Sequence, residues 1–229
     1  MMIYNIDERV EAFSTMRDEN PPFEVLQPHQ THTDNVVVID DRNMTRDDLQ
    51  GVDALVTNLK DYGIAVRTAD CVPVLMYDGV KEVIAAVHSG WKGTVSKIVQ
   101  KTVKVMINQF GSKPENIKAV IGPSIGPESF QVGHEVCEMF EKAGFPMNEI
   151  MIDRGKREEK TMRGGLHIDL WRANEWLLNS VGVFSIYIYG VCTYENNDKF
   201  FSARHEGRKC GRIINGIRIK VIGDSCERL

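Results

Sequence analysis

The stretch Ala85-Ala86-Val87-His88-Ser89-Gly90-Trp91-Lys92-Gly93-Thr94 predicts a buried strand that turns sharply into a helix. The run from Glu82 to Val87 is apolar and rich in β-formers, which is typical of a strand. The two glycines that follow allow a tight turn and a close approach of a ligand to the backbone. In α/β sheets, functional groups collect where strands meet the following helices. His88 sits at such a junction, so it is either a functional group or a histidine that merely hydrogen-bonds to a neighbouring loop.

Composition places the 229-residue chain among ordinary globular enzymes, with 42% hydrophobic and 26% charged residues. This length fits one large domain, and we expect a single domain over residues 1–229. The formal net charge of −4 argues against a nucleic-acid partner. No apolar run approaches the roughly 20 residues of a membrane-spanning helix, and the first residues do not resemble a signal peptide. We therefore expect a cytoplasmic protein with no nucleic-acid or membrane partner.

The five cysteines are widely spaced and odd in number, and no two of them form a CxxC pair. This pattern is a poor disulfide framework and excludes a zinc ribbon or finger, so free thiols are expected. The cysteines are Cys71, Cys137, Cys192, Cys210 and Cys226. Cys137 lies in an amphipathic segment where a thiol usually packs as a small apolar group, and packing is also favoured for Cys192.

Apolar periodicity predicts strands mixed with helices throughout the chain. The predicted strands cover residues 35–39, 53–57, 63–67, 72–77, 82–87, 117–122 and 184–191, and residues 213–222 are expected to form a last strand or a hairpin. The predicted helices cover residues 94–110, 134–142 and 169–180. The first helix is the clearest, because its apolar residues recur at three- and four-residue steps and Gly111 supplies a stop. The charged stretch from Asp153 to Gly165 is expected to be a solvated loop rather than a phosphate-binding patch.

Three separate segments each place a metal-capable side chain at the boundary of an element, namely His32, Cys71 and His88. A thiolate and two imidazoles suit Zn²⁺. Three protein ligands would also leave one tetrahedral position open, as in catalytic zinc sites. Spacing alone leaves open the alternative of three unrelated core or loop residues.

Six motifs together make the chain recognisable. They are Gln30-Thr31-His32, Asp53-Ala54-Leu55-Val56-Thr57, Thr68-Ala69-Asp70-Cys71-Val72-Pro73, His88-Ser89-Gly90-Trp91-Lys92-Gly93-Thr94, Ile121-Gly122-Pro123-Ser124-Ile125-Gly126-Pro127 and Phe200-Phe201-Ser202-Ala203-Arg204. This set closely resembles the YfiH-like family of polyphenol oxidase or laccase-domain proteins, also described as zinc-dependent purine nucleoside phosphorylases. The resemblance runs from about Phe13 to Ile222. It implies an α/β (α+β) sandwich of mixed sheets covered by helices.

The resemblance also implies one zinc ion per chain, held by His32, Cys71 and His88. The implied reactions are phosphorolysis of inosine, guanosine, adenosine and methylthioadenosine to the free base and (methylthio)ribose 1-phosphate, together with adenosine deamination. Purine nucleosides and phosphate would then be the partners. The chemistry is reasonable because Zn²⁺ lowers the pKa of a bound water towards ~7, and the resulting hydroxide can attack C6 of adenine.

The candidate anion contacts are Arg67, Arg204 and, more weakly, Lys92, although each could equally be a surface or structural cation. Asp70, next to Cys71, could orient a ligand or shuttle a proton, or it could only cap the neighbouring turn. The expected catalytic residues are therefore Asp70, Cys71 and His88.

The chain departs from the family's pattern at Met16 and His205, where arginine is usual, and at Thr33, where glycine is usual. Lys92 also replaces an arginine and lacks its bidentate fork, and Cys210 replaces a threonine. None of these changes removes an implied zinc ligand, but they could alter substrate preference or activity.

Other function classes stay open. A cysteine hydrolase or amidase would use Cys71 as nucleophile and His88 as base. A copper-dependent polyphenol oxidase is disfavoured, because its several copper centres need many ligands and the chain has six dispersed histidines without a His-x-His pair. A non-catalytic interaction role also survives.

Overall fold

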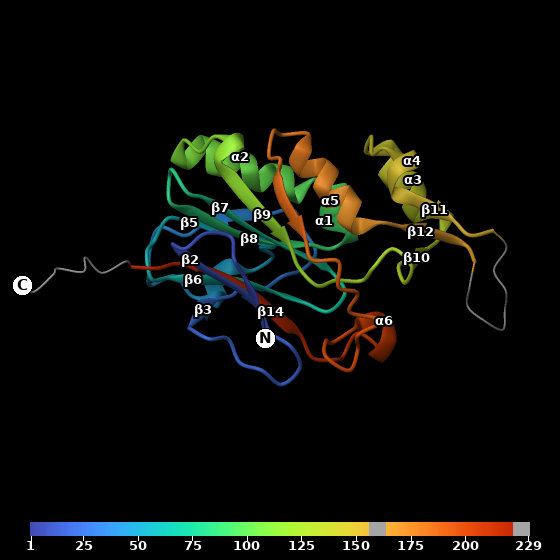
Figure 1. Ribbon diagram of the computed structural model, residues 1–229, viewed down its shortest axis with the longest axis horizontal. Coiled ribbons are helices and arrows are strands. Elements are labelled where there is room, and N and C mark those ends of the chain that lie inside the picture. The colour runs from blue at the N-terminus through green and yellow to red at the C-terminus, as the bar shows by residue number, and fades with distance from the viewer. Residues whose placement is uncertain (156–163, 222–229) are drawn as a thin grey trace, which may run out of the picture.

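Two continuous apolar runs form the central strands of the molecule, β7 (Val72–Asp78) and β8 (Val83–Ser89). Every residue of both strands is buried, so the sheet that contains them must be covered on both faces. In the computed structural model, which describes residues 1–155 and 164–221, a second sheet covers one face and helices cover the other (Figure 1). The expected sandwich of mixed sheets covered by helices is confirmed.

The larger sheet has six strands in the order β13-β9-β7-β8-β5-β4. Its remaining strands are β4 (Val36–Val38), β5 (Ala54–Thr57), β9 (Ile117–Ile121) and β13 (Ser185–Ile188). The central strands pair antiparallel, whereas each edge strand pairs parallel with its neighbour. The sheet is therefore mixed, and the start of β5 lies beside the end of β8.

The smaller sheet has five strands in the order β1-β2-β14-β6-β3. They are β1 (Met2–Tyr4), β2 (Val10–Ser14), β3 (Val25–Leu26), β6 (Gly63–Thr68) and β14 (Ile213–Ile219). The last described strand, β14, lies between β2 and β6 and pairs antiparallel with both. Its Ile217 packs with Ile64 of β6 against Leu75 and Ile84 of the larger sheet, which forms one half of the core.

The other half of the core lies under helices α1 (Trp91–Val95), α2 (Ile98–Phe110) and α5 (Leu170–Asn179). Helix α2 buries Ile98, Val103 and Met106, and each such side chain contributes roughly 1.5–3 kcal/mol of transfer free energy. Gly111 ends α2 as expected, with φ of 69° and its N–H donated to Ile107 O.

The predicted continuous helix over 94–110 is wrong in one respect. The structure has two helices in this segment, and the first of them begins at Trp91. The break falls at Lys97, which adopts a left-handed conformation with φ of 62°. A lysine does not signal a left-handed conformation in the sequence. The apolar spacing on both sides of Lys97 therefore predicted one continuous helix.

A small three-stranded sheet lies at one end of the sandwich, with helices α3 (His134–Lys142) and α4 (Met147–Ile150) beside it (Figure 1). Its strands are β10 (Gln131–Val132), β12 (Leu166–Ile168) and β11 (Met151–Asp153). Helix α3 has the predicted bounds, whereas the small sheet and strands β1 to β3 were not predicted. Within the described ranges, the remaining elements are the short helices η1 (Arg46–Leu49), η2 (Pro114–Asn116) and α6 (Ala203–Glu206).

Cys226, the end of the last predicted strand and most of the charged loop fall on residues 222–229 and 156–163, outside the described residues. Across the described ranges, no helix is both long enough and apolar enough to cross a membrane. The expectation of one domain over residues 1–229 stays a prediction.

Candidate metal centre

His88 occupies the end of β8, where the chain turns through Gly90 into α1. Its ring is buried, and Nδ1 lies 2.6 Å from Oδ1 of Asp53. The carboxylate accepts this hydrogen bond, so the second ring nitrogen, Nε2, is left to bind a metal ion. The backbone N–H of His88 also donates to Asp53 O at 2.8 Å, which fixes the position of the residue as well as the orientation of its ring.

Asp53 holds the loop of His32 in the same way. Its carboxylate accepts from the backbone N–H groups of Thr31 (3.3 Å), His32 (3.1 Å) and Thr33 (2.8 Å), and from Thr33 Oγ1 (2.8 Å). These bonds stabilise a left-handed His32 with φ of 63°. Burial raises the pKa of Asp53, but the hydrogen bond to His88, its charge and the bonds from Thr33 outweigh burial and lower the pKa to about 2. One buried carboxylate therefore positions both histidines.

Cys71 follows β6 and precedes β7, and its Sγ lies 3.8 Å from His32 Nε2. Burial raises the pKa of the thiol, but the charge of His88 and hydrogen bonds from both histidines outweigh it and lower the pKa to about 6. Burial likewise lowers the pKa of His88, whereas the Cys71 thiolate and Asp53 raise it to about 9. Without a metal ion, these directions favour a thiolate beside an imidazolium.

The structure brings together the three residues that the sequence singled out. The donor atoms of His32, Cys71 and His88 all lie within 4.8 Å of one another. Ligands about 2.0–2.3 Å from one tetrahedral ion stand about 3.5 Å apart, so small side-chain movements would close the group around an ion. The side chains therefore fit a metal ion, and two nitrogens with one thiolate suit zinc or another soft metal.

The space around the sulfur depends on Gly90. A Cβ at this position would lie 2.9 Å from Cys71 Sγ and 3.3 Å from His32 Cδ2. Glycine is therefore required here for close approach, not for an unusual backbone conformation, since φ is −63° and ψ is 165°.

The group lies in a cavity of about 840 Å³ that is also lined by Arg67, Lys92, Arg204 and Asp70. Arg204, on α6, donates from Nη1 to Ser129 O (3.3 Å) and Gln131 O (3.1 Å). All of the site residues expected from the sequence therefore face one cavity.

Asp70 is fully engaged within the protein. Its Oδ1 accepts from Thr193 Oγ1 at 2.7 Å, and its Oδ2 accepts from the backbone N–H of Arg204 at 2.6 Å. It is nearly buried and has a left-handed φ of 84°. Both contacts are distant in sequence, so Asp70 ties the start of α6 to the chain beside Cys71. Its expected catalytic role stays a prediction.

The sequence did not reveal the roles of Asp53 or of the further pocket cations Arg46, Arg208 and Arg212. A carboxylate at the start of an otherwise apolar strand was the available signal for Asp53. The pocket cations lie in segments without periodicity, and only the fold brings them together.

Two other cysteines and two further histidines lie outside the metal centre. Cys137 packs in the apolar core as expected, and Cys192 Sγ accepts from Gly126 N at 3.2 Å. His134 is exposed at the start of α3, and His167 Nδ1 faces Pro127 O at 3.0 Å.

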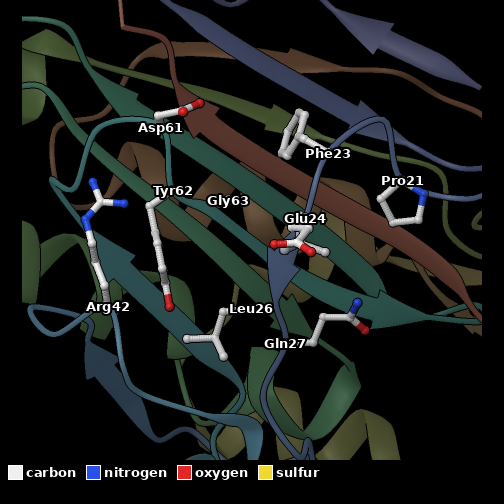
Figure 2. A pocket seen from close by; sticks show the side chains of 10 residues that line it. Pro21, Phe23, Glu24, Leu26, Gln27, Arg42, Asp61, Tyr62 and Gly63 are labelled. Atoms are coloured by element: carbon white, nitrogen blue, oxygen red, sulfur yellow. The ribbon is translucent and has the colours of Figure 1, made fainter.

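A second hollow, of about 930 Å³, opens beside the edge strand β3. Figure 2 shows Arg42 beside Tyr62 on one wall of this hollow, with Leu26 close by. The Arg42 guanidinium lies 5.6 Å from the ring centre of Tyr62 and donates to Lys60 O at 2.6 Å. None of the described residues that line it is a histidine or cysteine, so the metal-ligating chemistry belongs to the first cavity.

The fold and site together define an α/β sandwich with a candidate single-ion metal centre. A family model described as multi-copper polyphenol oxidoreductase laccase matches residues 6–220, so the chain belongs to this family. A solved structure of the hypothetical protein YfiH from Bacillus licheniformis matches with a TM-score of 0.81 and 26% identity, covering 92% of this chain and 93% of that one. The resemblance to the YfiH-like family is thus confirmed.

Two relatives have names that refer to purine nucleosides. A protein from Bacteroides thetaiotaomicron named purine nucleoside phosphorylase is 46% identical over 206 residues, which cover 86% of this chain and 74% of that protein. A protein of an unknown prokaryotic organism named adenosine deaminase RL5 is 41% identical over 202 residues, covering 85% and 74% respectively.

Proposed function

We propose that the chain is a zinc-dependent purine nucleoside enzyme. It would catalyse phosphorolysis of inosine, guanosine, adenosine and methylthioadenosine, and it would deaminate adenosine. The observation that carries this proposal is the convergence of His32, Cys71 and His88 within 4.8 Å, in a cavity that is also lined by cations. The names of the relatives supply the substrate class.

His32, Cys71 and His88 would hold the zinc ion, with Asp53 fixing the ring of His88 and the loop of His32. When bound, the ion supplies a Lewis acid that polarises a reacting oxygen. Asp53 acts as a positioning residue, because its carboxylate contacts the histidines and not the cavity that would hold substrate.

Arg67, Lys92 and Arg204 would hold the phosphate and stabilise charge during the reaction. In phosphorolysis, a phosphate oxygen forms a bond to C1′ while the bond from C1′ to the purine nitrogen breaks, giving the free base and ribose 1-phosphate. Asp70 would hold Arg204 in place through its backbone N–H. Trp91 and Phe130, which also line the cavity, offer aromatic faces for the purine.

The test is chromatographic analysis of the products from inosine and from adenosine, each with and without phosphate. Inosine should give hypoxanthine and ribose 1-phosphate only with phosphate, and adenosine should give inosine and ammonia without it. Dialysis against a chelator should remove both activities, and zinc should restore both. Phosphorolysis that persists in metal-free protein while deamination disappears would show that the two reactions do not share one metal site.

A second candidate function is a cysteine hydrolase, favoured by the lowered pKa of Cys71 beside His88. Thiol alkylation before and after chelation separates the two candidates. A zinc ligand is protected until the metal is removed, whereas a catalytic thiol reacts equally in both states and its alkylation abolishes turnover.

Metal analysis tests the alternative of a copper-dependent polyphenol oxidase, since the description of the family names a multi-copper laccase. Within the part of the chain that the structure describes, one group of at least three possible metal ligands is found. We expect one zinc ion per chain, whereas several copper ions per chain would refute the zinc proposal.

A further inference from the structure

Three polar side chains are buried together beneath the turn that follows His88. This buried polar cluster consists of Ser89, Thr94 and Asn174, which are all fully buried, although the core around them is built from apolar residues of β8, α2 and α5. Asn174 lies on the buried face of α5, where its buried neighbours on the helix are leucine and alanine residues. A buried amide costs free energy unless its polar atoms are paired, so its partners indicate its role.

The cluster is held by hydrogen bonds that leave each of its polar side-chain atoms with a partner. Ser89 Oγ donates to Asn174 Oδ1 at 2.7 Å. Asn174 Nδ2 donates to Leu170 O at 2.8 Å and more weakly to Thr94 Oγ1 at 3.3 Å. Thr94 Oγ1 lies 3.0 Å from both Ser89 Oγ and Gly90 O, so its own hydrogen has an acceptor in the turn. The cluster therefore joins the turn to α5, a helix that is distant in sequence.

The turn carries one candidate metal ligand and shapes the space of another. Ser89 directly follows His88 at the end of β8. Gly90 stands against Cys71, because a Cβ there would lie 2.9 Å from Sγ. The N–H of Thr94 donates to Gly90 O at 2.8 Å within α1, and Figure 1 shows α1 beside α5 on the same face of the larger sheet. A shift of the turn relative to α5 would therefore move both His88 and the wall that confines Cys71.

Asp53 holds His88 from the sheet, whereas the buried polar cluster holds the following residues from the helix layer. Asp53 directly precedes β5 and contacts the ring and the backbone N–H of His88. The chain then leaves the sheet, and its next side-chain contacts are those of Ser89 with Asn174 and Thr94. An apolar residue in place of Asn174 would leave the hydroxyls without the amide that aligns them. A fully paired buried network fixes one arrangement of the elements that it joins.

We propose that Asn174 is a positioning residue of the metal centre. Through Ser89 and Thr94 it holds the turn in one place, which keeps the free ring nitrogen of His88 beside Cys71 Sγ. The inference rests on the proposed function, since it concerns the zinc centre of that same site. It adds a residue that neither belongs to the group of ligands nor lines the cavity. Residues that orient metal ligands change metal affinity about 10- to 100-fold when they are replaced.

Competition with a chromogenic chelator measures the zinc affinity of wild type, Asn174→Leu and Thr94→Val. Leucine has the branched shape of asparagine and valine that of threonine, so each variant mainly removes hydrogen bonds. We expect each to bind zinc about tenfold more weakly than wild type. Thr94→Ser keeps the hydroxyl and should restore most of the affinity. Because both residues act through one cluster, the double variant should lose about as much affinity as either single variant.

Thr102→Val is the matched control. Thr102 is fully buried in the same helix layer, but its hydroxyl donates to Ile98 O at 2.9 Å within α2. Its replacement should lower the melting temperature of the metal-free protein and leave the zinc affinity within about twofold of wild type. Cobalt(II) in place of zinc gives a second measurement, because its visible absorption reports the geometry of the ligands. That spectrum should change in Asn174→Leu and not in Thr102→Val.

Zinc affinity within about twofold of wild type in folded Asn174→Leu and Thr94→Val would overturn the inference. An equal loss of affinity in Thr102→Val would also overturn it, because it would indicate a general loosening of the core. If Asn174→Leu does not fold, Thr94→Val and its serine counterpart decide the question. The proposed function fails separately, by absence of inosine and adenosine turnover in zinc-loaded wild type, and the comparison of affinities does not depend on turnover. A wild-type protein that binds no zinc would refute both.

Discussion

Replacement of Gly90 by alanine should weaken metal binding and leave the fold intact. The φ of −63° and ψ of 165° at Gly90 suit alanine, so the change adds only a methyl group. That carbon would lie 2.9 Å from Cys71 Sγ. Ordinary non-bonded contacts are about 3.6 Å, so the sulfur must retreat by about 0.7 Å.

This displacement is large for a metal ligand, because metal–ligand distances tolerate only about 0.2 Å. Overpacking of this kind costs about 1–3 kcal/mol, and about 1.4 kcal/mol corresponds to a tenfold change in affinity. The affinity for zinc should therefore fall about 5- to 150-fold. The metal-free protein should melt close to wild type, since Cys71 is only partly buried and its side chain can rotate.

The assay is competition for zinc with a chromogenic chelator, performed on wild type and on the Gly90→Ala variant. Gly79→Ala is the control, because its methyl group would meet the terminal Nη2 of Arg9 at 2.8 Å. That nitrogen ends a long flexible side chain that can move aside. Zinc affinity within twofold of wild type in folded Gly90→Ala would refute the assignment of Cys71 as a ligand.

Three further outcomes follow from the structure. Cys71→Ala should abolish metal binding and turnover with little change in melting temperature. Cys137→Ala should instead lower the free energy of unfolding by about 1 kcal/mol and leave turnover unchanged. Equal activity in wild type and Cys71→Ala would eliminate both the zinc enzyme and the cysteine hydrolase as candidate functions. Asp53→Asn should weaken zinc binding about 10- to 100-fold in the same competition assay, and unchanged affinity would remove Asp53 from the centre. Hydrogen bonds from Arg9 hold the pKa of Asp7 in the folded protein well below the ordinary value of an aspartate. The ionised carboxylate therefore stabilises the fold at any pH above that ordinary value. This stabilisation is lost as the pH falls from the ordinary pKa through the pKa of the folded state. Asp7→Asn should thus lower the melting temperature at pH 7, and its difference from wild type should shrink below about pH 4; a difference independent of pH would contradict this.

Strong periodicity made the main elements of the fold predictable. Helix α3 and the Gly111 end of α2 follow from local sequence, because apolar spacing and a left-handed glycine are local signals. The break at Lys97 does not, since a lysine with positive φ is imposed by the packing around it. The short strands β10 to β12 escape detection because two or three residues carry no period.

The site was predictable only in part. His32, Cys71 and His88 stood out as metal-capable residues at element boundaries, but their convergence depends on how three distant segments fold, and the family resemblance supplied that link. The role of Asp53 in positioning the histidines could not be predicted from the sequence for a related reason. Its carboxylate meets His88 only because β5 lies beside β8, which neither strand's own sequence encodes.

The position of β14 between β2 and β6 has a consequence for biosynthesis. The strands on either side of it leave the ribosome early, yet they cannot join into one sheet until residues 213–219 have emerged. Arg212, at the wall of the cavity, arrives just before that strand. Until then, the nascent chain carries two unpaired strand edges, a state prone to aggregation. We therefore expect folding to depend on chaperones. We also expect the binding pocket to form slowly and late.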